Sequence, residues 1–296
     1  MNNFNINLFN PNEFYQYAQK HFPALCEPRA SDSHKGTYGS LGIIGGAQGM
    51  VGAPLLAARA ALKQGTGRVY IGFAQASLPI SLDPLHAEIM LKTAEDLIEL
   101  QHLTALVIGC GLGLNDYAKE LLSHSLQCTS QFPLVIDADA LSLLAQDVVI
   151  AESVGQESAI RVLTPHPTEA ARLLHCDTQE VQANRQDALK ALVQTYQCWI
   201  VLKGHATLIG SPDGMIISNP SGNPGLASGG TGDVLAGMIG ALLAQAIPTQ
   251  QAIAGATWLH GAAADYLVSQ GIGPIGLTAS EVLIAARTLR NLLINT

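Results

Sequence analysis

Short apolar segments alternate with alanine- and leucine-rich segments along most of this 296-residue chain, and this alternation restricts the fold more than any other feature. The apolar runs are rich in β-branched residues, as in "LGIIGG", "GRVYIG", "ALVIGCGLG", "PLVIDADAL", "RVLTPHPTEAARLL" and "WIVLKG". Stretches with helical periodicity follow several of them, such as "APLLAARAALKQG" and "DYAKELLSHSL". Strands that alternate with helices pair in parallel and are covered by those helices. The sequence therefore predicts an α/β fold with a mainly parallel central sheet and helices on both faces.

One segment, "TLIGSPDGMIIS", departs from this alternation. Two short apolar runs flank a Ser-Pro-Asp-Gly turn, which predicts a hairpin at or near the edge of the sheet. No repeat and no Pro/Ser-rich linker divides the chain, so we expect one domain over residues 34–296. Residues 1–33 look like an N-terminal appendage that contains a short helix, "NEFYQYAQKHF".

The charge content limits the classes of partner. Charged residues make up 13% of the chain, about half of the usual share of roughly 25%. The net charge is −8 and no basic cluster offsets it, which disfavours binding to a nucleic acid. A surface so poor in charge indicates that partner subunits cover part of it. Five widely spaced cysteines indicate reduced thiols in a cytoplasmic protein, and the N-terminus does not have the pattern of a signal peptide.

Residues 234–264 contain no Asp, Glu, Lys or Arg. Pro248, Gln250, Gln251 and His260 interrupt this run, and it is rich in alanine and glycine. The composition predicts two closely packed buried helices and not a membrane span.

Two glycine-rich turns follow predicted strands. "GGAQGMVGAP" (residues 45–54) and "GCGLG" (residues 109–113) both lead into helices. Glycines there let backbone amides approach a phosphate at a helix N-terminus, but they equally serve tight packing of a strand against a helix. Gly113 is the position at which we expect the closest approach of a ligand.

The segment "TPHPTEAARLL" (residues 164–174) also lies where a strand ends and a helix begins. His166 stands between two prolines, where an imidazole can donate a hydrogen bond to an anion or to a ribose hydroxyl. Glu169 lies in the first helical turn, and by itself it is better explained by stabilisation of the helix dipole than by a role in binding.

The stretch "SGNPGLASGGTGDVLAG" (residues 221–237) holds six glycines and one charge, Asp233. Asp233 can be interpreted as a helix N-cap, but an N-cap does not require Gly-Gly-Thr-Gly before it. Small residues bring consecutive amides to one point at the positive end of a helix, which forms an anion hole. An aspartate beside that hole can accept a proton from a hydroxyl that attacks a phosphoryl group.

Together these motifs resemble those of the ADP-dependent NAD(P)H-hydrate dehydratases of the ribokinase-like superfamily, from about His34 to the C-terminus. The resemblance rests on "HKGTYGSLGIIGG", "GAPLLAARAAL", "DADAL", "TPHPTEAARLL", "VLKGHAT" and "NPSGNPGLASGGTGDVLAG". Related sugar kinases carry Asn where this chain has His166, a difference that disfavours a sugar kinase. Bifunctional relatives carry an epimerase domain ahead of this one, and the short N-terminal segment leads us to expect a stand-alone dehydratase.

The resemblance implies a repair reaction on hydrated NADH or NADPH. The terminal phosphoryl group of ADP is transferred to the hydroxyl at C6 of the damaged nicotinamide ring. Phosphate then leaves, which gives NAD(P)H, AMP and phosphate. Asp233 is the implied base, and the amides of Gly230 to Gly232 hold the phosphoryl oxygens.

Further site residues follow by position from the same resemblance. The residues expected to contact the hydrate are Ala53, Gly113, His166 and Asp233. Those expected to contact the adenine nucleotide are Lys203, Gly204, His205, Ala206, Thr207 and Gly232. The nucleotide implies Mg²⁺, whose waters Glu169 would orient, and the family implies a homotetramer that works with a separate NAD(P)H-hydrate epimerase.

Two other functions remain open at this point. One is an ATP-dependent kinase of a small hydroxylated metabolite, such as a vitamin precursor, which would use the same aspartate and anion hole. The other is a non-catalytic regulator that binds a nucleotide with these glycine turns. Turnover of hydrated NADH with ADP, and release of AMP, distinguish the dehydratase from both.

Overall fold

A computed structural model describes residues 9–155 and 159–294. Within these residues nine strands form one sheet in the order β3-β2-β1-β4-β5-β6-β7-β8-β9. The strands are β1 (Ser40–Gly45), β2 (Arg68–Phe73), β3 (Met90–Thr93), β4 (Ala105–Ile108), β5 (Leu134–Ile136), β6 (Arg161–Leu163), β7 (Trp199–Leu202), β8 (Leu208–Gly210) and β9 (Ile216–Ser218). All pairs from β3 across to β7 are parallel, whereas β7–β8 and β8–β9 are antiparallel. The predicted α/β class and the predicted hairpin at the sheet edge are both confirmed.

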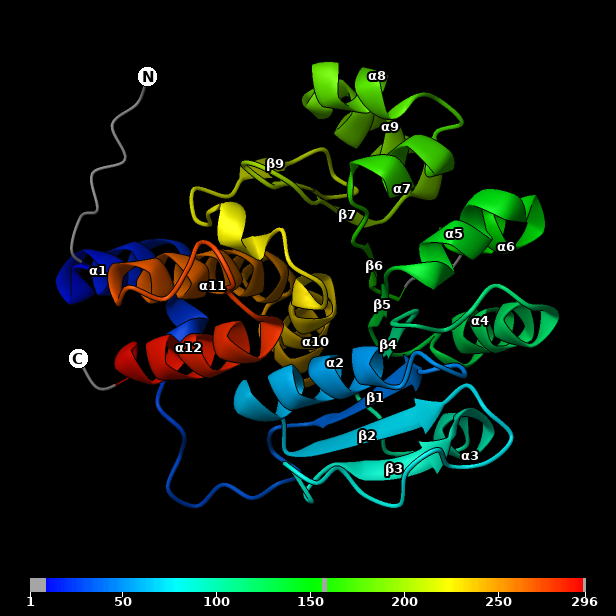
Figure 1. The fold of residues 1–296 in the computed structure, drawn as a ribbon, viewed down its shortest axis with the longest axis horizontal. Coiled ribbons are helices and arrows are strands. Elements are labelled where there is room, and N and C mark those ends of the chain that lie inside the picture. Colours follow the sequence, from blue (N-terminus) through cyan, green and yellow to red (C-terminus); the bar gives the residue numbers. More distant parts are fainter. Residues whose placement is uncertain (1–8, 156–158, 295–296) are drawn as a thin grey trace.

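Helices cover both faces of the sheet (Figure 1). The first set, on one face, comprises α1 (Pro11–His21), α2 (Gly52–Lys63), α10 (Thr231–Ala244), α11 (Thr249–Ser269) and α12 (Ala279–Leu292). The second set comprises α3 (Ala94–Ile98), α4 (Asp116–Cys128), α5 (Asp139–Gln146), α6 (Val148–Ser153), α7 (Pro167–Leu173), α8 (Thr178–Ala183) and α9 (Arg185–Tyr196). Two short 3₁₀ helices, η1 (Pro23–Leu25) and η2 (Pro224–Leu226), lie in loops.

The strands supply both cores because successive side chains point to opposite faces. In β4, Val107 belongs to the apolar cluster of the first helix set, whereas Leu106 and Ile108 belong to that of the second. All four residues of β4 are buried, as is typical of a parallel strand covered on both sides. This double burial explains why the strands read as continuous apolar runs.

The uncharged run forms α10 and α11, which pack against each other as predicted. Every residue of α10 after Asp233 is buried, so the absence of charge reflects packing inside the protein. Across the described residues, no helix combines the length and the apolar character that crossing a lipid bilayer requires.

The N-terminal helix α1, which the sequence predicts, packs on α11. The Phe14 ring stacks on Trp258 with 4.6 Å between ring centroids, and Phe22 lies 5.5 Å from the same indole. Residues 11–25 thus share a core with the larger region. The division between an appendage and a domain at residue 34 stays a prediction.

The chain order of the strands reverses between β1 and β4, because β2 and β3 lie on one side of β1 and the later strands lie on the other. In open α/β sheets such a reversal opens a crevice beyond the carboxyl ends of the strands. We call the side where the parallel strands end the carboxyl edge, and the side where they begin the amino edge. The candidate residues lie at the carboxyl edge.

Candidate active site

Helix α10 begins two residues before Asp233. Gly230 is its N-cap residue, with φ of 88°, and no side chain caps the helix among the described residues. Asp233 therefore lies inside the first turn, and the interpretation of Asp233 as an N-cap is wrong. The first amides of an uncapped helix have no partner within the helix, so this terminus can accept an anion.

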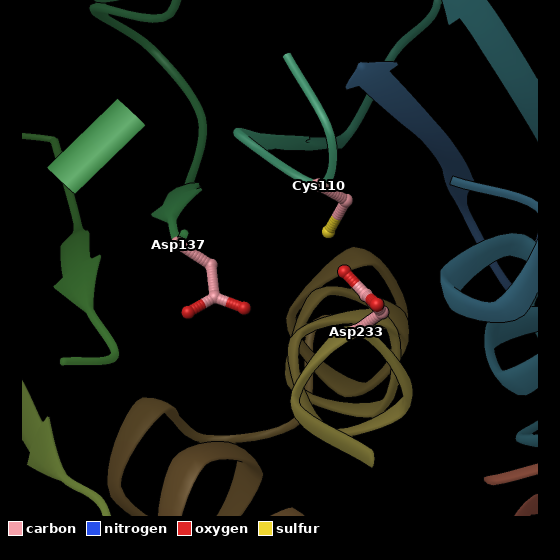
Figure 2. A group of neighbouring side chains, drawn as sticks. All are labelled: Cys110, Asp137 and Asp233. Atoms are coloured by element: carbon pink, nitrogen blue, oxygen red, sulfur yellow. The ribbon is translucent and has the colours of Figure 1, made fainter. Parts of the chain in front are cut away.

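Asp233 faces two residues from the strand side of the site. Cys110 follows β4 and Asp137 follows β5, and one donor atom of each lies within 4.8 Å of the others and of an Asp233 carboxylate oxygen (Figure 2). Burial and the charge of Asp137 raise the pKa of Asp233 to about 6, although Cys110 and Lys203 oppose the rise. Such a carboxylate is a stronger base than an exposed aspartate and is still ionised near neutral pH.

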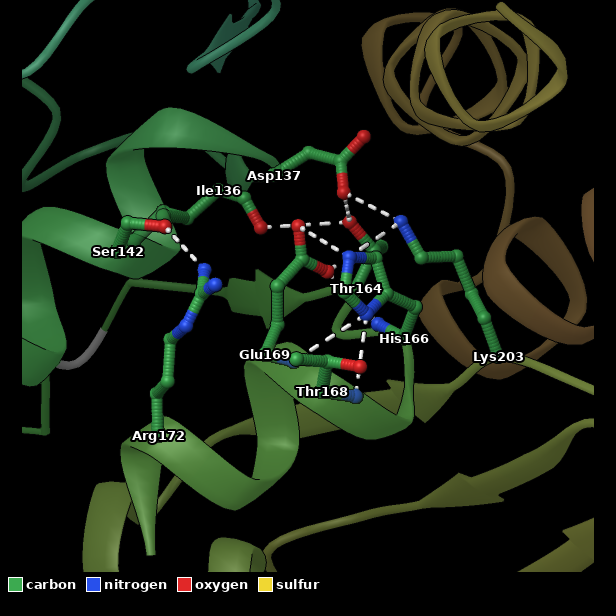
Figure 3. A network of polar contacts seen from close by, with 9 residues as sticks. All are labelled: Ile136, Asp137, Ser142, Thr164, His166, Thr168, Glu169, Arg172 and Lys203. Carbon is green, nitrogen blue, oxygen red and sulfur yellow. Dashed lines mark hydrogen bonds and ion pairs between the residues drawn. The ribbon is translucent and has the colours of Figure 1, made fainter. Parts of the chain in front are cut away.

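Lys203 links Asp137 to a third carboxyl group. Its Nζ lies 2.8 Å from Asp137 Oδ1 and 3.8 Å from Glu169 Oε2 (Figure 3). Thr164 Oγ1 donates to the same Asp137 oxygen at 2.7 Å. Burial alone would lower the pKa of Lys203, but the carboxylates of Asp137 and Glu169 outweigh burial and raise it. Lys203 is thus a fixed cation at the end of β7 and not a solvated lysine.

His166 and Glu169 form a reciprocal cap at the start of α7. His166 Nδ1 accepts from the amides of Thr168 and Glu169, and Glu169 Oε2 accepts from the His166 amide at 2.7 Å. Burial raises the pKa of Glu169 to about 7 in spite of the nearby Lys203. Burial and then Lys203 lower the pKa of His166, which favours the neutral ring. Glu169 therefore does more than stabilise a helix dipole, since it is buried against Lys203 at the site.

The two glycine turns after β1 and β4 lie against each other. The Gly46 amide donates to the Cys110 carbonyl, and the Ala47 amide donates to the Gly111 carbonyl. Gly113 has φ of 84°, and a Cβ there would meet only the Ala47 side chain, at 3.4 Å. Both the packing interpretation and the open position at Gly113 are thus compatible with the structure.

Ala53 lies in the first turn of α2, close to Gly111, where a Cβ on the glycine would come 3.3 Å from the Ala53 side chain. The Gly113 amide donates to Asp139 Oδ2 at 2.9 Å. These two positions expected to contact the hydrate therefore border the same pair of turns.

The predicted nucleotide positions divide into two groups. Gly232 belongs to the centre, because a Cβ on it would lie 3.5 Å from Lys203 Nζ. Gly204, His205 and Ala206 form an exposed turn beyond Lys203, where Thr207 Oγ1 donates to the Gly204 carbonyl at 3.0 Å. The structure brings Lys203 to Gly232 and leaves His205 at the surface.

Several residues at this centre have no assigned role in the sequence prediction. They are Cys110, Asp137, Asp139, Thr164 and Arg185. Asp137 had a usable signal, because "DADAL" places a carboxylate directly after a buried strand. Arg185 had none, because its guanidinium reaches the carbonyls of Leu202 and Lys203 from α9, 17 and 18 residues away along the chain.

Comparisons with known proteins indicate the family of the chain. A family model described as NAD(P)H-hydrate dehydratase matches residues 41–283. The chain is 46% identical over 270 residues to the ADP-dependent (S)-NAD(P)H-hydrate dehydratase of Neisseria meningitidis, covering 91% of each chain. It is 42% identical to a bifunctional NAD(P)H-hydrate repair enzyme of Coxiella burnetii. The aligned region covers 91% of this chain and 54% of that protein. The crystal structure of the ADP/ATP-dependent NAD(P)H-hydrate dehydratase of Bacillus subtilis, co-crystallised with ATP/Mg²⁺, superposes with a TM-score of 0.81 at 29% identity, covering 98% and 99% of the two chains.

Proposed function

The chain belongs to the NAD(P)H-hydrate dehydratase family, and we propose that it catalyses the ADP-dependent dehydration of the S form of hydrated NADH or NADPH. The observation that supports this most directly is the position of Asp233, a carboxylate of raised pKa in the first turn of an uncapped helix. A base and an anion site meet there, which is what transfer of a phosphoryl group to a hydroxyl requires.

The reaction runs in two steps. Asp233 accepts the proton of the C6 hydroxyl as that oxygen attacks the terminal phosphorus of ADP, and AMP leaves. The lone pair of the ring nitrogen then expels phosphate from C6, and loss of a proton from C5 restores the dihydronicotinamide. The products are NAD(P)H, AMP and phosphate, and phosphate leaves far more readily than hydroxide.

The anion site has two components from this chain. The amides from Gly230 to Gly232 lie at the N-terminus of α10, where the helix dipole favours negative charge. Lys203 adds a positive charge beside Gly232. We assign the terminal phosphoryl group of the nucleotide to this point, and the rest of the nucleotide to the turn of residues 203–207.

We assign the nicotinamide half of the substrate to the opposite side of Asp233. Ala53 and Gly113 border the glycine turns there. The half-buried His166 ring, whose pKa is lowered by burial and by Lys203, stands at the start of α7 and completes this set.

Mg²⁺ fits the site as a partner of the phosphates. The carboxyl groups of Asp137, Glu169 and Asp233 are the hard oxygen donors that Mg²⁺ prefers, whereas the Cys110 thiol is a soft donor. Lys203 already neutralises Asp137, so the residues that the structure describes offer Mg²⁺ no complete set of ligands. The ion would neutralise phosphate charge while keeping several waters, and Glu169 is positioned to orient them.

The decisive experiment mixes the protein with hydrated NADH, ADP and Mg²⁺. We expect the dihydronicotinamide absorbance to return, with one AMP and one phosphate formed per NADH. The comparisons do not favour the alternative kinase. Phosphorylation of a hydroxymethylpyrimidine or thiazole alcohol by ATP, without turnover of hydrated NADH, would establish that kinase instead.

We further propose a cytoplasmic homotetramer that acts beside a separate NAD(P)H-hydrate epimerase. All five cysteines are free thiols, and large apolar side chains such as Leu85, Val149 and Ile275 are exposed. Covering such side chains favours association of subunits. A monomer by light scattering at micromolar concentration would refute the tetramer.

A further inference from the structure

The two halves of the proposed substrate need separate space at the carboxyl edge. The positions assigned to the nicotinamide half, Ala53 and Gly113, border the turns after β1 and β4. The nucleotide that donates the phosphoryl group is assigned to the other side of Asp233, at the end of β7. The adenosine half of the hydrate therefore has to extend away from β7, past β1 toward β2 and β3.

A cavity of ≈ 450 Å³ lies in that direction. Its lining residues include Ala47 after β1, Ala76 after β2 and Glu95 after β3. A Cβ at Gly113 would lie 3.4 Å from the Ala47 side chain, so the cavity adjoins the turn that is assigned to the nicotinamide. Cavities that hold small ligands measure about 300–1,000 Å³, so this one is large enough for a nucleoside.

The distance along the sheet suits a dinucleotide. Strand β2 lies two strands from β4, with β1 between them (Figure 1). At the usual spacing of about 4.8 Å between neighbouring strands, the ends of β2 and β4 are about 10 Å apart. The pyrophosphate that joins two nucleosides spans such a distance. A substrate whose nicotinamide lies at Gly113 therefore reaches the cavity with its adenosine.

The turn between these two positions leaves room for the pyrophosphate. A Cβ at Gly49 or at Gly52 would meet nothing within 4 Å beyond the adjacent residues, so the backbone there is open on one side. Gly52 is the first residue of α2, and no side chain caps that helix among the described residues. The N-terminus of α2 therefore favours the negative charge of the pyrophosphate.

Among its described lining residues, the cavity has one carboxylate, that of Glu95, and no Lys, Arg or His. Glu95 Oε1 accepts a hydrogen bond from the Tyr117 hydroxyl, and this bond lowers the pKa of Glu95, so the group is ionised at neutral pH. An ionised carboxylate has about four acceptor positions, so Glu95 can also accept from ribose hydroxyls. A 2′-phosphate in that place would instead meet a like charge with no cation in the lining to neutralise it.

We propose that this cavity binds the adenosine half of the hydrate, and that Glu95 makes the enzyme prefer NADH hydrate to NADPH hydrate. The inference rests on the proposed function and adds the location and the form of the substrate. In dinucleotide-binding sheets generally, a carboxylate that accepts from the ribose 2′-hydroxyl favours NAD, whereas an arginine accommodates the 2′-phosphate. We expect kcat/KM for NADH hydrate to exceed that for NADPH hydrate about tenfold, because apposed like charges weaken binding.

Glu95→Gln tests the preference, because it removes the charge but keeps the size of the side chain and an acceptor for Tyr117. The ratio of kcat/KM between the two hydrates should fall toward one, mainly because NADPH hydrate is turned over better. Glu99→Gln is the matched control, since it removes the same charge from an exposed glutamate at the other end of α3, outside the cavity. A ratio near one in the wild type, or a ratio that Glu95→Gln and Glu99→Gln change equally, would overturn the role of Glu95.

Ala76→Trp tests the cavity itself, because the larger side chain would fill it. We expect kcat/KM for NADH hydrate to fall at least about tenfold, because the binding energy of the remote adenosine half is lost. The hydrate of reduced nicotinamide mononucleotide, which lacks that half, should react equally with the wild type and the variant. KM for ADP should stay within about twofold.

The outcomes separate this inference from the proposed function. No loss with NADH hydrate in Ala76→Trp, or an equal loss with the hydrated mononucleotide, would overturn the assignment of the cavity while the dehydratase activity stands. A wild-type protein that turns over neither dinucleotide hydrate would refute the proposed function, and this inference with it.

Discussion

The two edges of the sheet differ in charge and in open space. At the carboxyl edge three carboxyl groups and Lys203 gather around the start of α10. At the amino edge a cavity of ≈ 880 Å³ opens among the loops where the strands begin. Among its described lining residues, which include Thr37, Thr104 and Phe132, there is no Asp, Glu, Lys, Arg or His. A large cavity is therefore not what marks the site in this protein.

The direction of the helices explains the difference. Five of the parallel strands, β1, β3, β4, β5 and β6, each lead into a helix at the carboxyl end, so helix N-termini and their free amides collect there. At the amino edge the helices end, and side chains bond their last carbonyls, as Thr104 does for the Ala244 carbonyl at 2.9 Å. The carboxyl edge thus keeps backbone amides available for a ligand. At the amino edge, backbone carbonyls form hydrogen bonds within the protein.

Asp233→Asn should show the largest effect at the carboxyl edge. Asn keeps the size of Asp233 but cannot accept the proton, and a general base contributes about 10²–10⁴-fold, so kcat should fall at least about 100-fold. Unfolding temperature should hold or rise, because burial and Asp137 already disfavour the charge of Asp233. Steady-state kinetics and thermal unfolding check this, with the exposed Asp116→Asn as control. More than about a tenth of wild-type turnover in a folded variant would contradict the mechanism.

Lys203→Met, also at the carboxyl edge, should lower the free energy of unfolding of the protein. It leaves the buried Asp137 carboxylate without its cation, and breaking a buried pair costs about 3–5 kcal/mol, so we expect about 3 kcal/mol in denaturant unfolding. Asp137→Asn in the same protein should recover part of the loss. The remaining activity should show a higher KM for ADP than the wild type, with less change in KM for the hydrate.

The exposed pair Lys190–Asp187, with 3.5 Å between Nζ and Oδ1, provides the control. Lys190→Met should change stability by less than about 1 kcal/mol, as is usual for surface pairs. A similar loss of unfolding free energy in both variants would contradict the assignment of Lys203 as a cation of the site. Equal changes in the KM values for ADP and for the hydrate in Lys203→Met would contradict it too.

The pH dependence of kcat/KM should reflect the raised pKa of Asp233. Burial and Asp137 raise this pKa to about 6, and the protonated carboxyl cannot accept a proton. We therefore expect activity to be full above that pH and to fall about tenfold per unit below it. Asp137→Asn removes the repelling charge and should move this limb to lower pH. A rate that stays constant down to pH near 5 would argue against Asp233 as the base.

Thr104→Val should show the smallest effect, at the amino edge. Thr104 Oγ1 accepts from the Ser40 amide and donates to the Ala244 carbonyl. Losing these bonds should cost about 1 kcal/mol in unfolding free energy. The kinetic constants should stay within about twofold, because distant sites seldom couple. A clear rise in KM for either substrate would show that the amino-edge cavity takes part in binding. It would contradict the conclusion that only the carboxyl edge binds substrates.

Much of the carboxyl edge could be predicted, because each strand and its following turn form one local pattern. Asp233 after Gly-Gly-Thr-Gly, and His166 with Glu169 after "TP", are local signals of this kind. Strand β3, by contrast, gave little signal, because "MLKT" is four residues long and pairs with only one neighbour at the sheet edge. Helix α10 starts at Thr231 because Gly230 adopts a positive φ, which the sequence permits but does not require.

The sequence by itself determined the α/β class, the edge hairpin and the loop that carries Asp233, because hydrophobic period and glycine placement act over a few neighbouring residues. Only the tertiary structure decided which groups meet. Asp137 and Lys203 are 66 residues apart, yet their side chains form an ion pair. Cys110 follows β4, yet its thiol lies near Asp233 in the first turn of α10. The raised pKa of Asp233 depends on burial and on Asp137, and both arise only when parallel strands bring their ends to one edge.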